Sequence, residues 1–202
     1  MLRWDGADTV VARLEALPYA GPQRPDLLVA LATAVAAGAP PAALEHAVAH
    51  VDLPAYRARP VAVLDGVEVI DDGMAATPSK TAAALAAYRD GSVVLIAGGI
   101  EDLGAGPVHA TPEEQELLEH ACDEVARRAR LAVLFGPAAA RLEPLLSARG
   151  VPLIGTQGLD EALEVATAHL EKAEVLLFSP MFPVSLEGRK RFASLAARYA
   201  SG

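Results

Sequence analysis

Two adjacent carboxylates, Asp71 and Asp72, end an apolar segment and precede a small-residue stretch and a Thr-Pro pair in IDDGMAATPSK. Thr77 before Pro78 is a favoured helix start, and the free N–H groups of a helix start can hold an anion. Capping alone explains Thr77, and we weigh that role above direct ligand contact. Because side chains alternate along a strand, Asp71 and Asp72 are predicted to point to opposite sides, one toward a ligand edge and the other toward solvent or a neighbouring loop. They are not expected to act as a paired acid and base.

Three further stretches rich in Gly, Pro or small residues follow apolar runs, namely AGGIEDLGAGP, FGPA and SPMFPVS. In parallel α/β sheets, ligands bind beyond the carboxyl ends of the strands, where small residues let the backbone approach a ligand closely. We therefore expect these loops, together with DDGMAATP, to form the ligand edge. No complete GxGxxG, GxxxxGK[ST], HExxH, CxxC or GxSxG motif occurs, so motifs alone assign neither a catalytic residue nor a metal ligand.

The elements that must position these loops alternate after Pro60. A hairpin turning at Asp65-Gly66 is followed by helices and strands in turn, and the strands are continuous apolar runs. Such runs are typical of strands covered by helices on both faces. The sequence thus predicts an α/β fold with a doubly wound, mostly parallel (Rossmann-like) sheet. The predicted strands are 61–72 (as a hairpin), 92–99, 131–136, 151–155 and 174–180, and the predicted helices are 77–90, 111–130, 137–150, 159–172 and 185–200.

The segment before Pro60 is less complete. A hairpin is predicted at Asp5-Gly6, and helices are predicted at 26–38 and 41–51. Two short strands and two alanine-rich helices make a poor core. We interpret this segment as an incomplete remnant of a second α/β domain.

Composition excludes several classes of protein. The net charge of −9 argues against a nucleic-acid partner, which requires clustered Lys and Arg. No apolar run approaches the ~20 residues of a membrane span, and no signal peptide is visible. The single cysteine, Cys122, fits a reducing compartment. We expect a cytoplasmic protein without nucleic-acid or membrane partners.

Four stretches, in order, resemble the Mur ligases, and above all the branch that adds glutamate to UDP-N-acetylmuramoyl-L-alanine. LPAYR with Arg57, then DGVEVIDDGMAATP, is similar to the family's hinge, where LP-(H)-R precedes a hairpin and NDSKATNP. LIAGG is similar to LLLGG, and LLFSPMFPVSLEGRKRFA to LLSPACASxDxFxxxxxRG. By this resemblance, residues 1–58 are the end of the central ATPase domain and residues 59–202 are the C-terminal amino-acid-binding domain.

The resemblance implies an ATP-dependent amide ligase, in which the donor carboxylate is phosphorylated and the amine of glutamate displaces phosphate. It implies that Arg57 and Asp72 contact ATP across the hinge. ATP and magnesium would be held mainly by the central domain, so no catalytic residue and no metal ligand are assigned in this chain. The residues implied to contact glutamate are Thr77, Ser185, Leu186 and Phe192.

The sequence also departs from the family pattern. Gly73 and Met74 stand where the family has Ser-Lys, and Asp102 falls near the place of a lysine that follows the Gly-Gly pair. Glutamate carries two carboxylates, whose burial requires cationic or hydrogen-bonding partners. The identity and chirality of the amino acid therefore stay open. The candidate substitutes for the missing cations are Lys80, Arg189 and Lys190.

Nothing in the sequence resembles the family's UDP-binding domain or its P-loop, so we expect the 202-residue chain alone to lack ligase activity. Glutamate-dependent phosphate release by the purified chain would contradict this expectation. The expected partners are glutamate, ATP, UDP-N-acetylmuramoyl-L-alanine and the enzyme's N-terminal and central domains.

Two alternatives stay open. The first is a non-catalytic binding or scaffold domain of Mur ligase fold, which the missing lysines favour. The second is a different Mur-like ligase, such as one adding glutamate to folate, although SP…S and DDGMAATP fit the muramoyl branch better.

Overall fold

The structure, a computed structural model, describes residues 23–48, 50–52, 54–100, 111–171 and 173–200. The chain forms two compact units, Met1–Pro54 and Ala55–Gly202. The hairpin predicted at Asp5-Gly6 lies outside the described residues. Among the described residues, no helix combines the length and the apolar character needed to cross a membrane.

The described part of the first unit contains two helices, α1 (Gln23–Ala36) and α2 (Pro41–Val48). Leu31, Leu44 and Val48 are its buried apolar side chains. The interpretation of this unit as the remnant of a larger domain stays a prediction.

The second unit is an α/β domain built on a six-stranded sheet with the order β1-β2-β6-β3-β4-β5. Only the β1–β2 pair is antiparallel, and the other strand pairs are parallel. This confirms the predicted mostly parallel sheet. The strands are β1 (Arg59–Leu64), β2 (Val67–Asp71), β3 (Val93–Gly98), β4 (Ala129–Phe135), β5 (Leu153–Thr156) and β6 (Val175–Met181). The helices are α3 (Pro78–Leu85), α4 (Pro112–Arg128), α5 (Ala139–Ser147), α6 (Leu159–Thr167) and α7 (Leu186–Tyr199).

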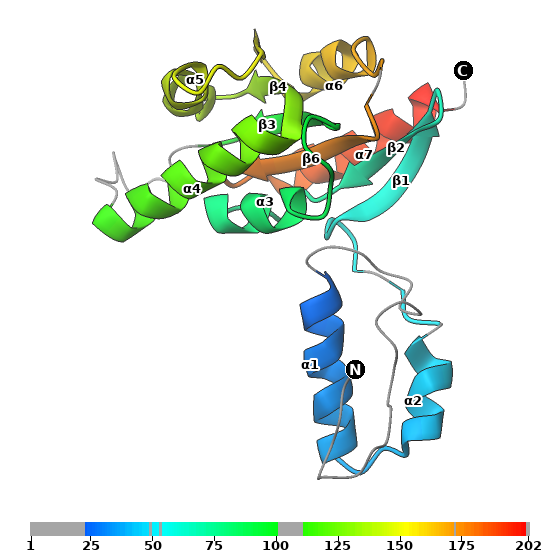
Figure 1. Cartoon of the computed structure of the whole chain (residues 1–202). Helices are drawn as coiled ribbons and strands as arrows, with labels where there is room; N and C mark the ends of the chain where they lie inside the picture. The colour runs from blue at the N-terminus through cyan, green and yellow to red at the C-terminus, as the bar shows by residue number, and fades with distance from the viewer. Residues whose placement is uncertain (1–22, 49, 53, 101–110, 172, 201–202) are drawn as a thin grey trace. The chain divides into compact units, whose positions relative to one another are not determined.

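Helices cover both faces of the sheet. Buried side chains of α3, α4 and α5 belong to one apolar layer, and those of α6 and α7 belong to the other. Figure 1 shows α3 and α4 side by side along the first face, with α7 behind the sheet. The last strand, β6, is inserted between β2 and β3, and all of its residues are buried. The loops that follow β2, β6 and β3 are therefore brought together at one rim.

Local sequence explains the hairpin that begins this unit. Asp65 and Gly66 have φ angles of 50° and 81°, which is the two-residue turn that matches the twist of antiparallel strands. Val67 and Val69 then face the α6–α7 layer, whereas Ile70 faces the α3–α5 layer. The alternation continues into Asp71 and Asp72.

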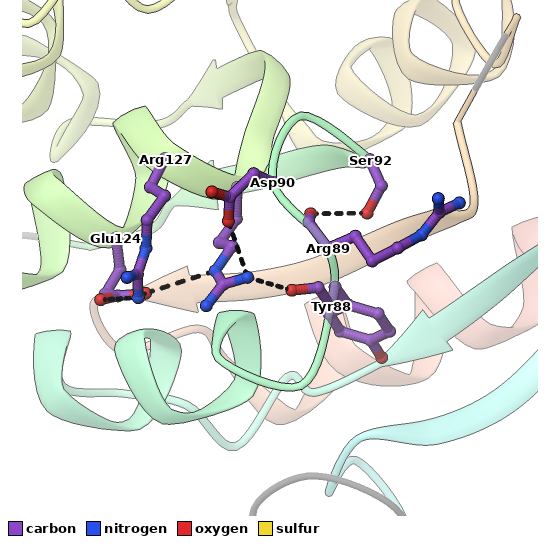
Figure 2. A network of polar contacts seen from close by, with 7 residues as sticks. Tyr88, Arg89, Asp90, Ser92, Glu124 and Arg127 are labelled. Carbon is purple, nitrogen blue, oxygen red and sulfur yellow. Dashed lines mark hydrogen bonds and ion pairs between the residues drawn. The ribbon is translucent and has the colours of Figure 1, made fainter.

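A polar cluster fixes the opposite, amino-terminal rim. The guanidinium of Arg128 donates to the carbonyl oxygen of Tyr88 and pairs with Asp90 at 2.8 Å and with Glu124 at 3.6 Å. Figure 2 shows Asp90, Glu124 and the Tyr88 carbonyl converging at this point. The cluster ties the turn between α3 and β3 to the end of α4, far along the strands from the candidate ligand edge.

Candidate functional site

Strand pairing places the predicted functional loops at one rim. Asp71 is in register with Phe178 of β6, and Gly98 of β3 is in register with Met181 of β6. Because these pairs are parallel, the loops beginning at Asp72, Gly99 and Phe182 all leave from the carboxyl ends of the strands. Ser185, at the end of the β6 loop, and Asp72 thus lie on the same edge of the sheet.

Asp72 is the centre of a buried hydrogen-bond network. Its Oδ1 accepts from the backbone N–H of Ala58 at 3.1 Å, and its Oδ2 accepts from the hydroxyl of Ser179 at 2.9 Å. The Ser179 hydroxyl lies 2.9 Å from Oγ1 of Thr81, which donates to the Ser179 carbonyl at 3.3 Å. The carboxylate therefore joins the β2 end, the β6 end and α3.

Asp71 points to the other layer, as the strand alternation predicts. Its Oδ1 accepts from the N–H of Gly73 at 2.9 Å, and the charge of Arg189 on α7 acts on it. Of the two possibilities predicted for the second aspartate, solvent or a neighbouring loop, solvent is excluded, since Asp71 and Asp72 are only 1% and 7% exposed, and Asp72 instead meets the segment before β1 through the N–H of Ala58. Both are enclosed because β6 continues past Phe178, the partner of Asp71, to Met181, and helices cover both faces of the sheet there.

Burial controls the ionisation of both carboxyls. Desolvation raises the pKa of Asp71 from 3.8 to about 6, against the opposing effects of the Gly73 N–H and the Arg189 charge. Desolvation likewise raises the pKa of Asp72 from 3.8 to about 6, against its bonds from Ser179 and Ala58, and the charge of Asp71 adds to the rise. Burial therefore moves the ionisation of both carboxyls up to about pH 6.

The segment that precedes β1 is held against this pair. The carbonyl of Tyr56 accepts from the N–H of Met74 at 3.0 Å, and the guanidinium of Arg189 lies 5.7 Å from the Tyr56 ring centroid. Tyr56 and Ala58 have φ angles of 63° and 42°, values that L-residues seldom adopt. Such strain persists only where surrounding contacts enforce it, and it gathers at functional positions. The exposed Arg57 lies between these two strained residues.

The Gly73-Met74 departure has a structural explanation. A Cβ at Gly73 would stand 2.9 Å from Cγ of Arg189 and 3.0 Å from Cε1 of Phe178. A guanidinium nitrogen of Arg189 contacts the sulfur of Met74. Arg189 thus fills the space that a side chain at position 73 would need, and the two departures belong to one packing arrangement.

Thr77 is the N-cap residue of α3 and lines a cavity of about 380 Å³. The predicted N-cap position is confirmed, but the side chain makes no capping bond to the helix and instead lies 3.2 Å from the hydroxyl of Ser79, so only the side-chain part of the capping explanation is wrong. The carbonyl of Thr77 still accepts the first helical bonds, from Lys80 and Thr81. The remaining lining comes from Ala76, Pro78, Ser79, Glu114, Leu117, Leu118, Arg141, Met181 and Phe182.

Ser185 lines a second, smaller cavity of about 190 Å³ on the α6–α7 side. Its hydroxyl accepts from the N–H of Gly188 at 3.1 Å and caps α7, a role the sequence analysis did not assign. Leu186 is 52% exposed beside it. Phe192 is fully buried and stacks on Phe178 with centroids 4.3 Å apart, so its ring offers no open surface to a ligand.

Two neighbouring backbone segments, hydrogen-bonded to each other, contribute to the walls of these cavities. We call residues 98–100 and 181–184 the glycine strap. The N–H of Ile100 donates to the carbonyl of Pro183 at 2.9 Å, and the N–H of Gly99 donates to the carbonyl of Phe135 at 3.1 Å. Met181 is held at a φ of 68° where β6 enters the strap. Thr77 and Ser185 therefore lie on the same rim but line different cavities.

Comparison with known proteins shows which family this chain belongs to. The family described as "Mur ligase, glutamate ligase domain" matches residues 56–182. The chain belongs to the Mur ligases.

Curated Mur ligases show the same relationship in sequence. The chain is 34% identical over 155 residues to the UDP-N-acetylmuramoylalanine–D-glutamate ligase of Frankia casuarinae, a match covering 76% of the chain and 30% of that enzyme. It is 36% identical over 155 residues to the enzyme of the same name from Cupriavidus metallidurans, covering 76% of the chain and 28% of that enzyme. The match thus spans less than a third of either relative.

Solved structures show the same fold. A UDP-N-acetylmuramate–alanine ligase from Thermotoga maritima matches with a TM-score of 0.64 and 18% identity, covering 92% of the chain and 39% of that protein. A pseudomurein peptide ligase type C from Methanothermus fervidus matches with a TM-score of 0.60 and 12% identity, covering 90% of the chain and 37% of that protein. These likenesses bear on the fold alone.

Proposed function

We propose that this Mur ligase chain is the C-terminal portion of an ATP-dependent enzyme that adds D-glutamate to UDP-N-acetylmuramoyl-L-alanine through an acyl-phosphate, in the cytoplasm. The observation that carries the proposal is the 34% identity over 155 residues to a ligase of that name. The shared rim of Asp72, Thr77 and Ser185 supports it, because it gathers the residues that the family resemblance implicates.

Arg57 and Asp72 are proposed to contact the nucleotide. Arg57 is exposed and cationic, which suits a phosphate, and its strained neighbours fix the backbone that presents it. Asp72 has one donor on each oxygen, so a lone pair of each remains for a ligand. Within the described residues, no group of three or more His, Cys, Asp or Glu side chains is placed to hold a metal ion. We propose that magnesium and most ATP contacts belong to the central domain.

Thr77, Ser185 and Leu186 are proposed to lie around the glutamate, with Phe192 packed beneath them rather than touching it. The two hydroxyls supply hydrogen-bonding groups from opposite sides of the glycine strap. One observation supports the alternative of a non-catalytic domain. Gly73 and Met74 stand where the family has Ser-Lys.

Glutamate binding tests this proposal. We expect millimolar D-glutamate to raise the melting temperature of the purified chain by about 4 °C at roughly ten times its Kd, and L-glutamate to raise it less. Ser185→Ala should abolish most of the shift. The control Ser92→Ala removes a hydroxyl that bonds Arg89 at the amino-terminal rim, so it should lower stability but keep the glutamate shift. A chain that responds to neither enantiomer would instead fit the non-catalytic alternative.

A further inference from the structure

Arg141, at the start of α5, differs from Arg128 and Arg149, two other arginines on the α3–α5 side of the sheet. Arg128 and Arg149 each pair with carboxylates, Arg128 with Asp90 and Arg149 with Asp123. No carboxylate among the residues that the structure describes lies within ion-pair distance of Arg141. Its guanidinium lies 5.6 Å from the ring centroid of Phe182, and a cation–π contact of this kind satisfies none of its N–H donors.

This guanidinium borders the cavity that Thr77 lines. At about 380 Å³ the cavity falls within the range of small-molecule sites, about 300–1,000 Å³. Most of its wall is apolar, from Leu117, Leu118 and Met181 among others. Apolar walls exclude water and strengthen a charged contact at the rim.

The other charged group of the lining is already engaged. The carboxylate of Glu114 accepts from the N–H of Thr111 at 2.8 Å, while the Thr111 hydroxyl accepts from the N–H of Glu114, forming a capping box at the start of α4. Arg141 is therefore the group of the lining that suits an anion, and it presents a planar fork of donors that fits a carboxylate.

The strand order sets the direction in which an amino acid would lie. Arg141 follows β4, which is separated from β2 and its Asp72 by β6 and β3. Thr77 and Ser79 also line the cavity, and they follow the Asp72 loop directly, at the start of α3. If the acyl-phosphate forms near Asp72, the reacting amine and its α-carbon must lie toward Thr77. The distal end of the amino acid then points toward Arg141.

We propose that Arg141 binds the side-chain carboxylate of the incoming amino acid and so selects an acidic side chain. Arg141 thereby replaces the lysines that the family pattern would place at Met74 and near Asp102. Arg189, one of the substitutes considered from sequence, instead contacts Met74 and Tyr56 and acts on Asp71. This inference rests on the proposed function, because it takes the ligand to be an amino acid with its amine near Asp72.

The test compares glutamate with glutamine, which has nearly the same shape but lacks the side-chain charge. Amide chemical-shift titrations of the whole chain, using Ser79 and Phe182 as reporters, would give Kd values for D-glutamate and D-glutamine. For the unmodified chain we expect at least roughly tenfold tighter binding of glutamate. Arg141→Gln should weaken glutamate binding by about tenfold or more, leave glutamine binding within about twofold, and so remove the preference.

Arg130→Gln is the matched control. Arg130 is also half-buried, but it stands at the amino-terminal start of β4, away from the cavity. This variant should keep both affinities. If the unmodified chain prefers glutamate and Arg141→Gln keeps that preference, the inference is wrong while the proposed function stands. If millimolar glutamate shifts no amide of the unmodified chain, both are overturned.

Discussion

Replacing Gly98 with alanine is expected to lower the free energy of unfolding of the 55–202 unit by more than about 4 kcal/mol, or to prevent its folding. A Cβ at this position would stand 1.9 Å from the carbonyl oxygen of Phe135 and 2.9 Å from its backbone nitrogen. These are backbone atoms of the neighbouring strand β4, so no side-chain rotation can relieve the clash. The rim of the sheet would have to open at the point where the glycine strap begins.

Gly150→Ala is the control for this clash, because it has the strain of an unusual backbone angle without the close contact. Gly150 also has a positive φ, 72°, but nothing lies within 4 Å of the Cβ it would gain. We expect it to lose only about 1–2 kcal/mol. Urea denaturation, with hydrogen exchange of the β3 and β4 amides as the local measurement, would compare the two variants. Equal losses in both would show that the backbone of β4 does not closely approach Gly98 of β3.

The fold after Pro60 was predictable because its signals are local and agree with one another. Asp65-Gly66 specifies the turn, Thr111-Pro112 begins α4, and continuous apolar runs such as the one preceding Ser179 mark the buried strands. The insertion of β6 between β2 and β3 was not predictable in the same way. Strand order depends on pairing between segments about a hundred residues apart, which no local pattern encodes.

The candidate site was likewise predictable from the sequence only in part. The rim was predictable, because loops at the carboxyl ends of parallel strands must converge. The contacts of Asp72 were not, although Ser179 gave a signal as a hydroxyl within an apolar strand, and Thr81 gave one as a hydroxyl on the apolar side of α3. Arg141 was missed because an arginine near a helix start is common, and only the cavity distinguishes it.

The buried charge of Asp72 leads to the second large expected effect. Asp72→Asn should raise the free energy of unfolding at pH 7.5 by about 2–3 kcal/mol, because a carboxyl whose pKa rises from 3.8 to about 6 on folding is destabilising when ionised. The network can accommodate the amide. The Nδ2 of the asparagine can donate to the hydroxyl of Ser179, and that hydroxyl then donates to Oγ1 of Thr81. The Thr81 hydroxyl already donates to the Ser179 carbonyl, so each hydroxyl has one acceptor.

The pH dependence fixes the sign of this effect. Since the folded chain holds the Asp72 proton more tightly than the unfolded chain, the stability linked to this group is full below pH 3.8 and is lost as the pH rises through about 6. As the pH rises from 5 to 7.5, the free energy of unfolding of the unmodified chain should therefore fall by about 1.4 kcal/mol more than that of Asp72→Asn. The control Asp65→Asn, which removes an exposed charge from the hairpin turn, should change stability by less than about 0.5 kcal/mol at either pH. Urea denaturation at the two pH values measures this difference. If Asp72→Asn were less stable than the unmodified chain at pH 7.5, the hydrogen bonds to the carboxylate would stabilise it by more than its burial costs.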